Sequence, residues 1–245
     1  MLPEDAASLE TALQHWGLAL SSEQRAQLQA FLDLLLRWNR VYNLTAIRRP
    51  QEAFTHHLLD CLAVVPPMAR RWQQRLGALP SDPSASAAMA PLQGGAPARV
   101  LDVGSGGGLP GVVLAVVCPQ WQVCCVDAVA KKASFVRQAA AELGLPNLRA
   151  EHARVENLAP QPQRAGAVGG FDWITSRAFA SLSDFASLTR PLLAPGGEWV
   201  AMKGRLPDDE LAALPASVQM FHVEPLEVPG LDAQRCLVWM RPASV

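Results

Sequence analysis

The residues best suited to chemistry follow a short apolar run that ends in an acid and a glycine. Residues 100–111 read Val-Leu-Asp-Val-Gly-Ser-Gly-Gly-Gly-Leu-Pro-Gly, and a second apolar run continues to Cys118. Alternating glycines let the backbone turn sharply and approach a ligand where a Cβ would collide. A strand, a tight turn and a helix in this order form the nucleotide crevice of an open α/β sheet. The pattern predicts ligand contacts by Gly104, Ser105, Gly106 and Leu109.

The spacing of these glycines separates two classes of ligand. The dinucleotide fingerprint G-x-G-x-x-G requires glycine at position 109, where this chain has leucine. The spacing present, G-x-G-x-G, is usual in enzymes that use S-adenosylmethionine. A second strand-like run, 122–127, ends in Asp127, whose carboxylate can accept both hydroxyls of a ribose. Together these features predict an adenosyl cofactor, and the alternative is a structural turn with a solvated Asp127.

Four more residues follow later strand-like runs. Ligands in such sheets bind beyond the carboxyl ends of the strands. Val155 and Glu156 come after the third run and are expected at the adenine rim, whereas Arg177 and Lys203 are expected at the mouth for the substrate. The alternative for the two cations is an ion pair with Asp127 or Glu156, or plain solvation.

Strand and helix patterns alternate from residue 99 onward. This alternation predicts a Rossmann-like α/β fold, a mainly parallel twisted sheet with helices on both faces. Two final strands, near 217–224 and 235–241, are expected to form an antiparallel hairpin at one edge. The other expected strands are 99–103, 122–127, 148–152, 171–176 and 198–203, and the expected helices are 109–118, 130–143, 181–190 and 208–213.

Helical periodicity also precedes the glycine turn, over residues 5–17, 22–39 and 51–65. Ser21 or Ser22 is a suitable N-cap for the second helix, and Gln24 completes a capping box with Ser21. The third helix is expected to stop at Pro66-Pro67. Residues 77–98 are rich in Pro, Ala, Gly and Ser. We therefore expect a helical N-terminal extension over 1–76, a flexible connection over 77–98 and a catalytic domain over 99–245.

His57 and Asp60 lie one turn apart on the third predicted helix, so they could share a hydrogen bond. No activated nucleophile accompanies them. We therefore interpret them as a pair that ties this helix to the following domain.

Composition sets broader limits. Half of the residues are hydrophobic and 18% are charged, which is typical of a globular protein. No apolar run approaches the ~20 residues of a membrane span, and the N-terminus lacks the features of a signal peptide. The five cysteines have no metal-ligand spacing and are expected to be buried, reduced thiols of a cytoplasmic protein without a metal site. With a net charge of −1, binding of nucleic acid would depend on a local patch such as the arginines at 37, 40, 48 and 49.

Six motifs in one order resemble the RsmG (GidB) family. They are Trp38-Asn39, Tyr42-Asn-Leu-Thr45, His57-x-x-Asp60, Gly-x-Gly-x-Gly-Leu-Pro-Gly111, Ser176-Arg-Ala-Phe-Ala-Ser181 and Lys203-Gly204. The resemblance runs from about residue 22 to 241. It departs from the family at Cys61, where a serine is common, and in the longer stretch 77–98. That family methylates N7 of one guanine in 16S ribosomal RNA, and the resemblance implies binding of S-adenosylmethionine by Gly104, Leu109, Val155, Glu156 and Arg177.

Methylation of guanine N7 suits the residues present. N7 carries a lone pair and no proton, so the reaction needs no general base. Catalysis would come from aligning N7 with the methyl carbon and the sulfur of the cofactor, and from removing water from the N7 lone pair. Arg177 and Lys203, with Lys131 or Lys132, are expected to hold phosphate or the guanine edge.

The expected partner is 16S ribosomal RNA or the small ribosomal subunit, without a membrane, and the expected state is a monomer. Three alternatives stay open at this point: a methyltransferase acting on a small molecule or a protein, an NAD-dependent oxidoreductase, which Leu109 disfavours, and a non-catalytic RNA-binding module.

Overall fold

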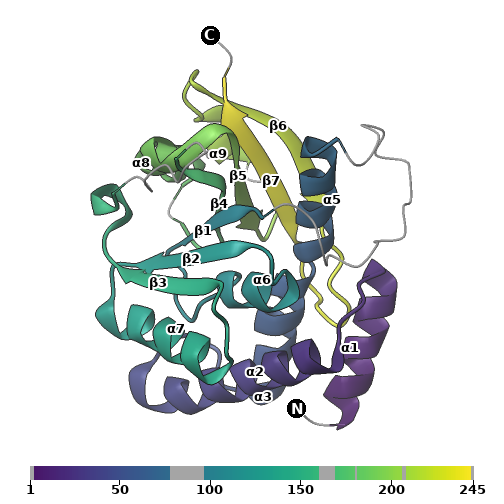
Figure 1. Cartoon of the computed structure of the whole chain (residues 1–245). Coiled ribbons are helices and arrows are strands. Elements are labelled where there is room, and N and C mark those ends of the chain that lie inside the picture. Colours follow the sequence, from purple (N-terminus) through teal and green to yellow (C-terminus); the bar gives the residue numbers. More distant parts are fainter. Residues whose placement is uncertain (1–2, 78–96, 160–168, 180, 206–207, 244–245) are drawn as a thin grey trace.

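The computed structural model describes residues 3–77, 97–159, 169–179, 181–205 and 208–243 (Figure 1). Within these ranges one sheet has the strand order β3-β2-β1-β4-β5-β7-β6. The first five strands of the chain run parallel, and β7 is antiparallel to both β5 and β6. The strands are β1 (Arg99–Val103), β2 (Gln122–Asp127), β3 (Leu148–His152), β4 (Phe171–Ser176), β5 (Leu193–Lys203), β6 (Val218–Pro225) and β7 (Cys236–Pro242).

Helices cover both faces of this sheet (Figure 1). The α-helices are α1 (Pro3–Trp16), α2 (Ser22–Tyr42), α3 (Pro50–Ala53), α4 (Asp60–Leu62), α5 (Val65–Arg75), α6 (Gly111–Val117), α7 (Ala130–Glu142), α8 (Leu182–Thr189) and α9 (Asp208–Ala212). A π-helix, η1 (Phe54–Leu59), joins α3 to α4, and the short 3-10 helices are η2 (Val155–Asn157) and η3 (Arg190–Leu192). The Rossmann-like fold class predicted from the sequence is confirmed.

The predicted strands agree closely with the structure at β1 to β4. The fifth begins earlier than expected, at Leu193, because residues 193–197 already extend along β4, where Phe171 pairs with Leu193. The antiparallel pair at the edge is confirmed, and β7 lies between β5 and β6. The helix predicted over 109–118 is shorter, since α6 starts at Gly111 with Pro110 at its N-cap position.

The N-terminal segment differs more from the prediction. The helix expected over 51–65 is divided into α3, η1 and α4. Helix α5 was not predicted, because Pro66-Pro67 was interpreted only as a stop signal. In the structure both prolines occupy the first turn of α5, where a missing N–H leaves no helical hydrogen bond unmade.

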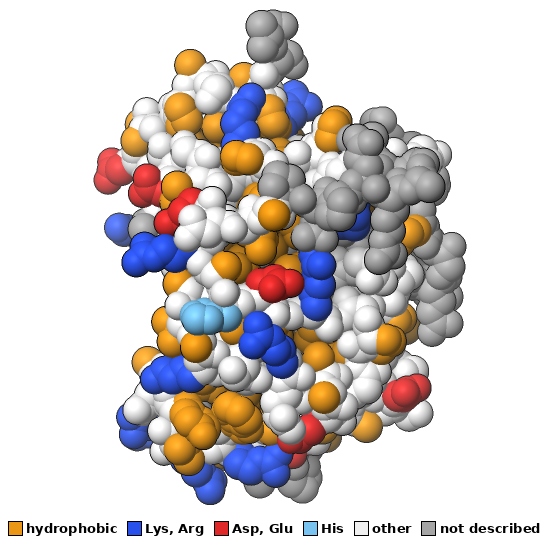
Figure 2. All heavy atoms as spheres, turned by 60° about the vertical axis from the view of Figure 1, so that its left-hand side comes forward, with side chains coloured by type: hydrophobic (Ala, Val, Ile, Leu, Met, Phe, Trp, Pro, Cys, Tyr) orange, Lys and Arg blue, Asp and Glu red, His pale blue; other side chains and the backbone are white. Residues whose placement is uncertain are grey.

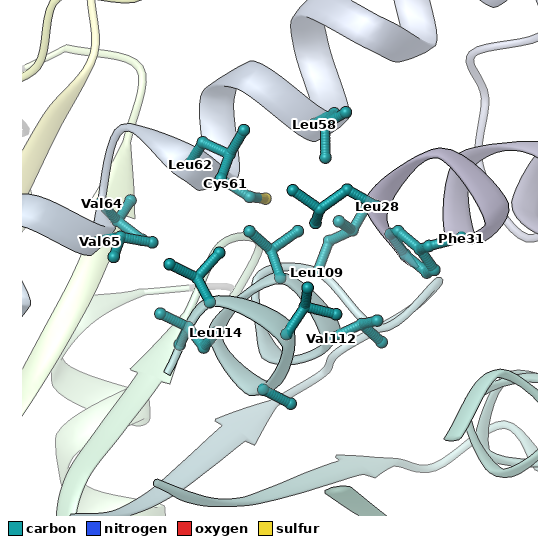
Figure 3. Packing of buried hydrophobic residues seen from close by; sticks show 14 of the residues in the cluster. Leu28, Phe31, Leu58, Cys61, Leu62, Val64, Val65, Leu109, Val112 and Leu114 are labelled. Carbon is teal, nitrogen blue, oxygen red and sulfur yellow. The ribbon is translucent and has the colours of Figure 1, made fainter. Parts of the chain in front are cut away.

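The N-terminal helices share one hydrophobic core with one face of the sheet. Trp173 of β4 packs against Trp72 of α5, with ring centroids 5.3 Å apart, and against Trp121 at 5.1 Å. Leu28 and Phe31 of α2 and Leu62 of α4 surround Leu109 (Figure 3). The boundary predicted over 77–98 lies almost entirely outside the described residues, so the division into an extension and a catalytic domain stays a prediction.

The capping box at the start of α2 is present. Ser21 Oγ accepts a hydrogen bond from Gln24 N at 3.1 Å, and Ser21 N donates to Gln24 Oε1 at 2.9 Å. Gln24 Nε2 also donates to the carbonyls of Val116 and Val117 at the end of α6. One cap therefore orders α2 and holds it against the helix that follows the glycine turn.

We expect Ser21→Ala to lower the free energy of unfolding by about 1 kcal/mol, because the first turn of α2 loses a capping acceptor. Urea unfolding measures this change. Ser22→Ala, at the next position, which is also exposed, is the matched control and should change stability by less than about 0.5 kcal/mol. Equal effects of the two substitutions would contradict the role of Ser21.

All five cysteines are buried and free, as predicted. Burial raises the pKa of their thiols, to about 11 for Cys124. Among the described residues, no helix combines the length and the apolar character needed to cross a membrane.

Candidate cofactor and substrate site

The order of the strands places a switch point between β1 and β4, because the chain builds the sheet outward in opposite directions from these two strands. The glycine turn follows β1, and Arg177 follows β4. Both segments therefore lie at the carboxyl end of the sheet, on the two sides of the crevice where this class of fold binds ligands.

The glycine turn has one open side. Gly104, Gly106 and Gly108 have φ values of 65°, 57° and 79°, which favour glycine. A Cβ on Gly104 would meet no atom within 4 Å, and one on Gly106 would meet only the Gly104 carbonyl oxygen at 4.0 Å. These two glycines thus present bare backbone to open space, as a turn that receives a ligand must.

The opposite side of the turn is packed. A Cβ on Gly107 would lie 2.8 Å from Leu35 Cδ1, and a Cβ on Gly111 would collide with Cys125 Sγ. The side chain of Leu109 is 3% exposed and lies among leucines of the N-terminal helices (Figure 3). Its N–H donates to the Ser105 carbonyl at 3.0 Å. The role of Leu109 in binding a cofactor stays a prediction, and its side chain serves the core.

Asp127 holds the turn in place. Its Oδ2 accepts a hydrogen bond from Gly106 N at 2.9 Å, and its Oδ1 accepts one from Val129 N at 2.8 Å. Lys132 Nζ lies 3.9 Å from Oδ2. A carboxylate oxygen can accept more than one hydrogen bond, so both oxygens retain capacity for ribose hydroxyls. The predicted ribose contact is compatible with this geometry.

Asp102 was not among the site residues predicted from the sequence. This carboxyl group is fully buried within β1, and its Oδ2 accepts a hydrogen bond from Gly111 N at 2.9 Å. Its Oδ1 has no hydrogen-bond partner among the described residues. Burial raises the pKa of Asp102 to about 7, and the positive charge of Arg177 opposes the rise. The sequence did offer one indication that Asp102 belongs to the site, because an acid lies there within a mainly apolar strand.

Val155 and Glu156 lie in η2, directly after β3. Val155 is buried, whereas the side chain of Glu156 is 43% exposed and lies 3.9 Å from Arg154. The pair thus lies after the carboxyl end of β3, the strand next to β2, and its contact with an adenine stays a prediction.

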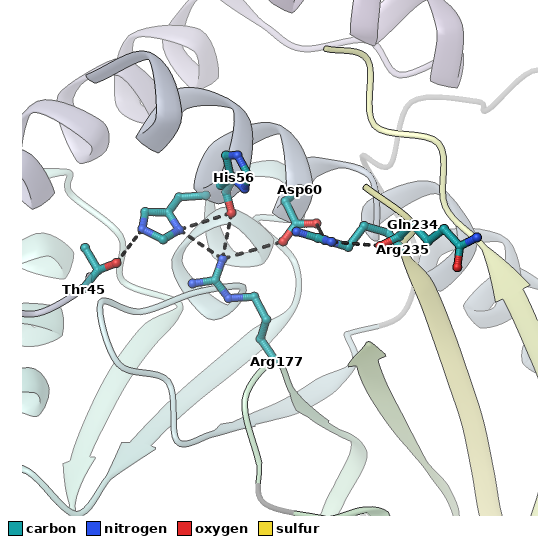
Figure 4. Close-up of polar contacts among 7 residues, drawn as sticks. Thr45, His56, Asp60, Arg177, Gln234 and Arg235 are labelled. Carbon is teal, nitrogen blue, oxygen red and sulfur yellow. Dashed lines mark hydrogen bonds and ion pairs between the residues drawn. The ribbon is translucent and has the colours of Figure 1, made fainter. Parts of the chain in front are cut away.

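Arg177 is bound by residues of the N-terminal segment (Figure 4). Its Nη1 donates to the His56 carbonyl at 3.1 Å, contacts His57 Nδ1 at 3.2 Å and lies 3.7 Å from Asp60 Oδ2. Neither Asp127 nor Glu156, the carboxylates considered from the sequence, is its ion-pair partner. The partner is Asp60, which the chain brings to the crevice on α4.

Asp60 joins three segments of the chain. It is 3% exposed and lies between Arg177 and Arg235, whose Nε donates to Asp60 Oδ1 at 2.9 Å (Figure 4). Burial raises the pKa of Asp60, and the two arginines oppose that rise. His57 and Asp60 therefore tie the N-terminal segment to the sheet, as predicted, but each does so through Arg177 and not through a bond to the other.

His57 is neutral in this cluster. Burial, reinforced by the charge of Arg177, lowers the pKa of His57 to about 4. Nδ1 of His57 lies 3.2 Å from Arg177 Nη1 and 3.2 Å from the His56 carbonyl oxygen. Nε2 is hydrogen-bonded to Thr45 Oγ1 at 2.8 Å.

The depressed pKa of His57 predicts a pH dependence of stability. In the unfolded chain His57 titrates near 6.5, so between about pH 6.5 and 4 the unfolded state binds a proton that the folded state does not. The contribution of His57 to the free energy of unfolding should fall as the pH is lowered through this window, by up to about 1.4 kcal/mol per unit, whereas Asp102, whose pKa is raised to about 7, contributes with the opposite sign. Urea unfolding at several pH values should give His57→Gln a smaller slope than wild type. A slope unchanged by His57→Gln but reduced by His222→Gln, at an exposed position, would contradict this assignment.

Lys203 ends β5 and forms an ion pair with Glu210 of α9, at 2.9 Å to Oε1 and 2.8 Å to Oε2. Glu210 Oε2 also accepts from Leu182 N at the start of α8. Lys203 lines a cavity of about 830 Å³. The other lining residues are Gly204, Arg205, Asp208, Asp209, Glu210, Ala233, Gln234 and Arg235. The two predicted cations thus have different partners, since Arg177 is held by the N-terminal segment and Lys203 by α9.

Comparison with known proteins agrees with this geometry. A family model described as rRNA small subunit methyltransferase G (GidB) matches residues 24–75 and 84–238. The protein of that name from Acidovorax ebreus (strain TPSY) is 55% identical over 244 residues, covering 97% of each chain. The one from Bordetella avium (strain 197N) is 49% identical over 243 residues, covering 98% of this chain and 96% of the relative.

A solved structure shares the fold alone. A mutant of MtNAS matches with a TM-score of 0.52 and 12% identity, over 91% of this chain and 75% of that one. The glycine turn, the acid at the end of β2 and the family model covering most of the sequence agree with one another, and this chain belongs to the GidB family of rRNA small subunit methyltransferases.

Proposed function

We propose that this protein transfers a methyl group from S-adenosylmethionine to N7 of a guanine in 16S ribosomal RNA. The observation that supports this most directly is the glycine turn, whose open side at Gly104 and Gly106 lies beside the Asp127 carboxylate. That combination suits an adenosyl cofactor, and the relatives named rRNA small subunit methyltransferase G supply the class of substrate.

The residues around the turn fit S-adenosylmethionine. Asp127 can accept the ribose hydroxyls while it continues to hold Gly106, and η2 offers Val155 and Glu156 to the adenine. The buried Asp102 places a carboxyl group behind the turn, within reach of the field of Arg177. When bound, the cofactor supplies a methyl group on a positively charged sulfur.

The protein's own contribution to the reaction is alignment and removal of water. Guanine N7 has a lone pair and no proton, so no side chain has to act as a general base. Arg177 and Lys203 border the crevice and the cavity next to it, where a guanidinium and an ammonium can hold phosphate or the O6 edge of guanine. Holding the two reactants in line is worth several orders of magnitude in rate.

Lys203→Ala is expected to lower kcat/KM for ribosomal RNA by about 10- to 100-fold, because Glu210 would stay beside the cavity without its cation. Steady-state methyl transfer measures this. Binding of S-adenosylmethionine should not change, and Lys203→Arg should recover part of the rate. A rate equal to wild type would remove Lys203 from the substrate site.

The direct test of the proposal is transfer of labelled methyl from S-adenosylmethionine to small ribosomal subunits prepared from cells lacking this protein. Deproteinised RNA from the same cells is the parallel sample. Label mapped to N7 of one guanine supports reaction, cofactor and substrate together. Binding of S-adenosylmethionine without transfer to either sample would favour a small molecule or a protein as substrate.

This function also implies a location and an oligomeric state for the protein. A substrate in the small ribosomal subunit implies an enzyme that works in the cytoplasm. We further propose that it acts as a monomer, which light scattering at the concentrations of the transfer assay would test.

A further inference from the structure

The C-terminal half of α2 lies against the packed side of the glycine turn. Leu35 packs against the glycine turn, where a Cβ on Gly107 would lie 2.8 Å from Leu35 Cδ1. Hydrogen bonds then lead from this helix to β4: Asn39 Oδ1 accepts from Thr45 N at 2.9 Å, and Thr45 Oγ1 bonds to His57, which contacts Arg177. The last turn of α2 is therefore held rigidly at the edge of the site.

The last turn of α2 exposes hydrophobic side chains. Val41 is 70% exposed and Tyr42 is 43% exposed. The Tyr42 ring packs on Trp38, with centroids 5.0 Å apart, and Trp38 packs edge-on against Phe135 of α7 at 5.5 Å. Tyr42 is thus supported from below by a layer of aromatic rings, while its other side faces solvent.

Four arginines lie near these residues in the sequence: two have a carboxylate partner, and two have none among the described residues. Arg37 faces Glu142 at 3.3 Å and Arg49 faces Glu52 at 3.4 Å. Arg40 and Arg48 are exposed and have no carboxylate partner among the described residues, and Arg48 instead donates to Asn43 Oδ1 at 3.0 Å. We call Arg40, Val41, Tyr42 and Arg48 the α2 rim. Figure 2 shows Lys and Arg side chains beside exposed hydrophobic side chains on the lower part of this face, over α7 and the end of α2.

An aromatic ring packed on one side, together with two arginines that have no carboxylate partner among the described residues, matches the chemistry of an unpaired RNA strand. Bases stack on aromatic side chains, arginines bind phosphates, and neither contact requires a particular base. The two exposed hydrophobic side chains form too small an apolar area for a stable protein–protein interface, which buries about 800 Å² on each partner. The composition of the rim therefore favours RNA over protein.

We propose that the α2 rim binds the unpaired RNA segment next to the target guanine, with a base stacked on Tyr42 and phosphates held by Arg40 and Arg48. This inference rests on the proposed function and assigns it a second contact surface, outside the crevice. The hydrogen bonds from Asn39 through Thr45 and His57 connect the last turn of α2 to Arg177, so a contact at the rim would fix the flanking strand relative to the crevice.

The test compares rim variants in methyl transfer to small ribosomal subunits from cells lacking this protein. Tyr42→Ala should raise KM for the subunit about 5- to 150-fold, the range that corresponds to loss of one stacked base. Tyr42→Phe should keep the wild-type KM because the stacking face remains. The Arg40→Ala, Arg48→Ala double variant should raise KM and weaken its dependence on salt. Neither kcat at saturating RNA nor the affinity for S-adenosylmethionine should change.

Arg49→Ala and Leu188→Ala are matched controls. Arg49 is already paired with Glu52, and Leu188 is a 40% exposed hydrophobic residue on α8. Both should keep the wild-type KM. Wild-type KM in all rim variants, with methyl transfer intact, would overturn the rim and leave the proposed function standing. A wild-type protein that binds S-adenosylmethionine and methylates no ribosomal RNA would overturn both. A KM raised equally by Tyr42→Ala and Tyr42→Phe would remove stacking as the mechanism.

Discussion

Replacing Asp60 by alanine is expected to lower the free energy of unfolding by about 3 kcal/mol and to reduce methyl transfer sharply. Asp60 is buried between Arg177 and Arg235, so its loss leaves two largely buried guanidinium groups without their shared counter-ion. Breaking a buried ion pair on one side costs about 3–5 kcal/mol, and the partial exposure of both arginines places this case at the lower end. Urea unfolding and steady-state transfer measure the two effects.

Glu224→Ala is the matched control for Asp60→Ala. Glu224 pairs with Arg70 of α5, at a more exposed position away from the glycine turn. Its loss should cost no more than about 1 kcal/mol and should leave methyl transfer unchanged. If Asp60→Ala were as stable as wild type, the Asp60 cluster could not be what holds the N-terminal segment to the sheet. If the Asp60→Ala variant lost stability but kept full methyl transfer at low temperature, Arg177 would not need its ion pair with Asp60 for catalysis.

Gly104→Ala is expected to weaken binding of S-adenosylmethionine at least 100-fold. Its φ of 65° is unfavourable for alanine, which costs about 1–2 kcal/mol of stability. The larger effect is on the ligand, because the new Cβ would project into the open side of the turn, where the cofactor backbone contact is proposed. Isothermal titration with S-adenosylmethionine measures the change in affinity.

Gly144→Ala is the control that distinguishes the effect of backbone strain from the effect of filling the ligand space. Gly144 has a φ of 64°, and a Cβ there would also meet nothing within 4 Å. It follows α7, away from the crevice, so the substitution should cost the same stability and leave the affinity unchanged. Equal loss of affinity in the two variants would mean that backbone strain, and not occupation of the ligand space, explains the effect at Gly104.

The parts of the fold that depend only on residues close together in the sequence could be predicted from the amino-acid sequence alone. The strands β1 to β4 are short apolar runs with turn residues at their ends, and β2 and β4 have the predicted bounds. The capping box of α2 needs only Ser21 and Gln24. The glycine turn likewise depends on local φ angles, which glycine alone adopts easily. For this reason the local pattern of residues was enough to predict its position, its form and the class of its ligand.

Contacts between residues distant in the sequence determined the ion-pair partner of Arg177, the burial of Asp102 and the presence of α5. Arg177 was expected at the substrate mouth, with an ion pair to Asp127 or Glu156 as the alternative. Its ion-pair partner is Asp60 of α4, since the N-terminal helices pack on the same face of the sheet as α6. The burial of Asp102 arises from strands on both sides of β1. Pro66-Pro67 carries the same local signal for a stop and for a first turn, and only packing of α5 on Trp173 distinguishes the two. Local preferences act over a few residues, whereas the partner of a buried charge is set by which segments the hydrophobic core brings together.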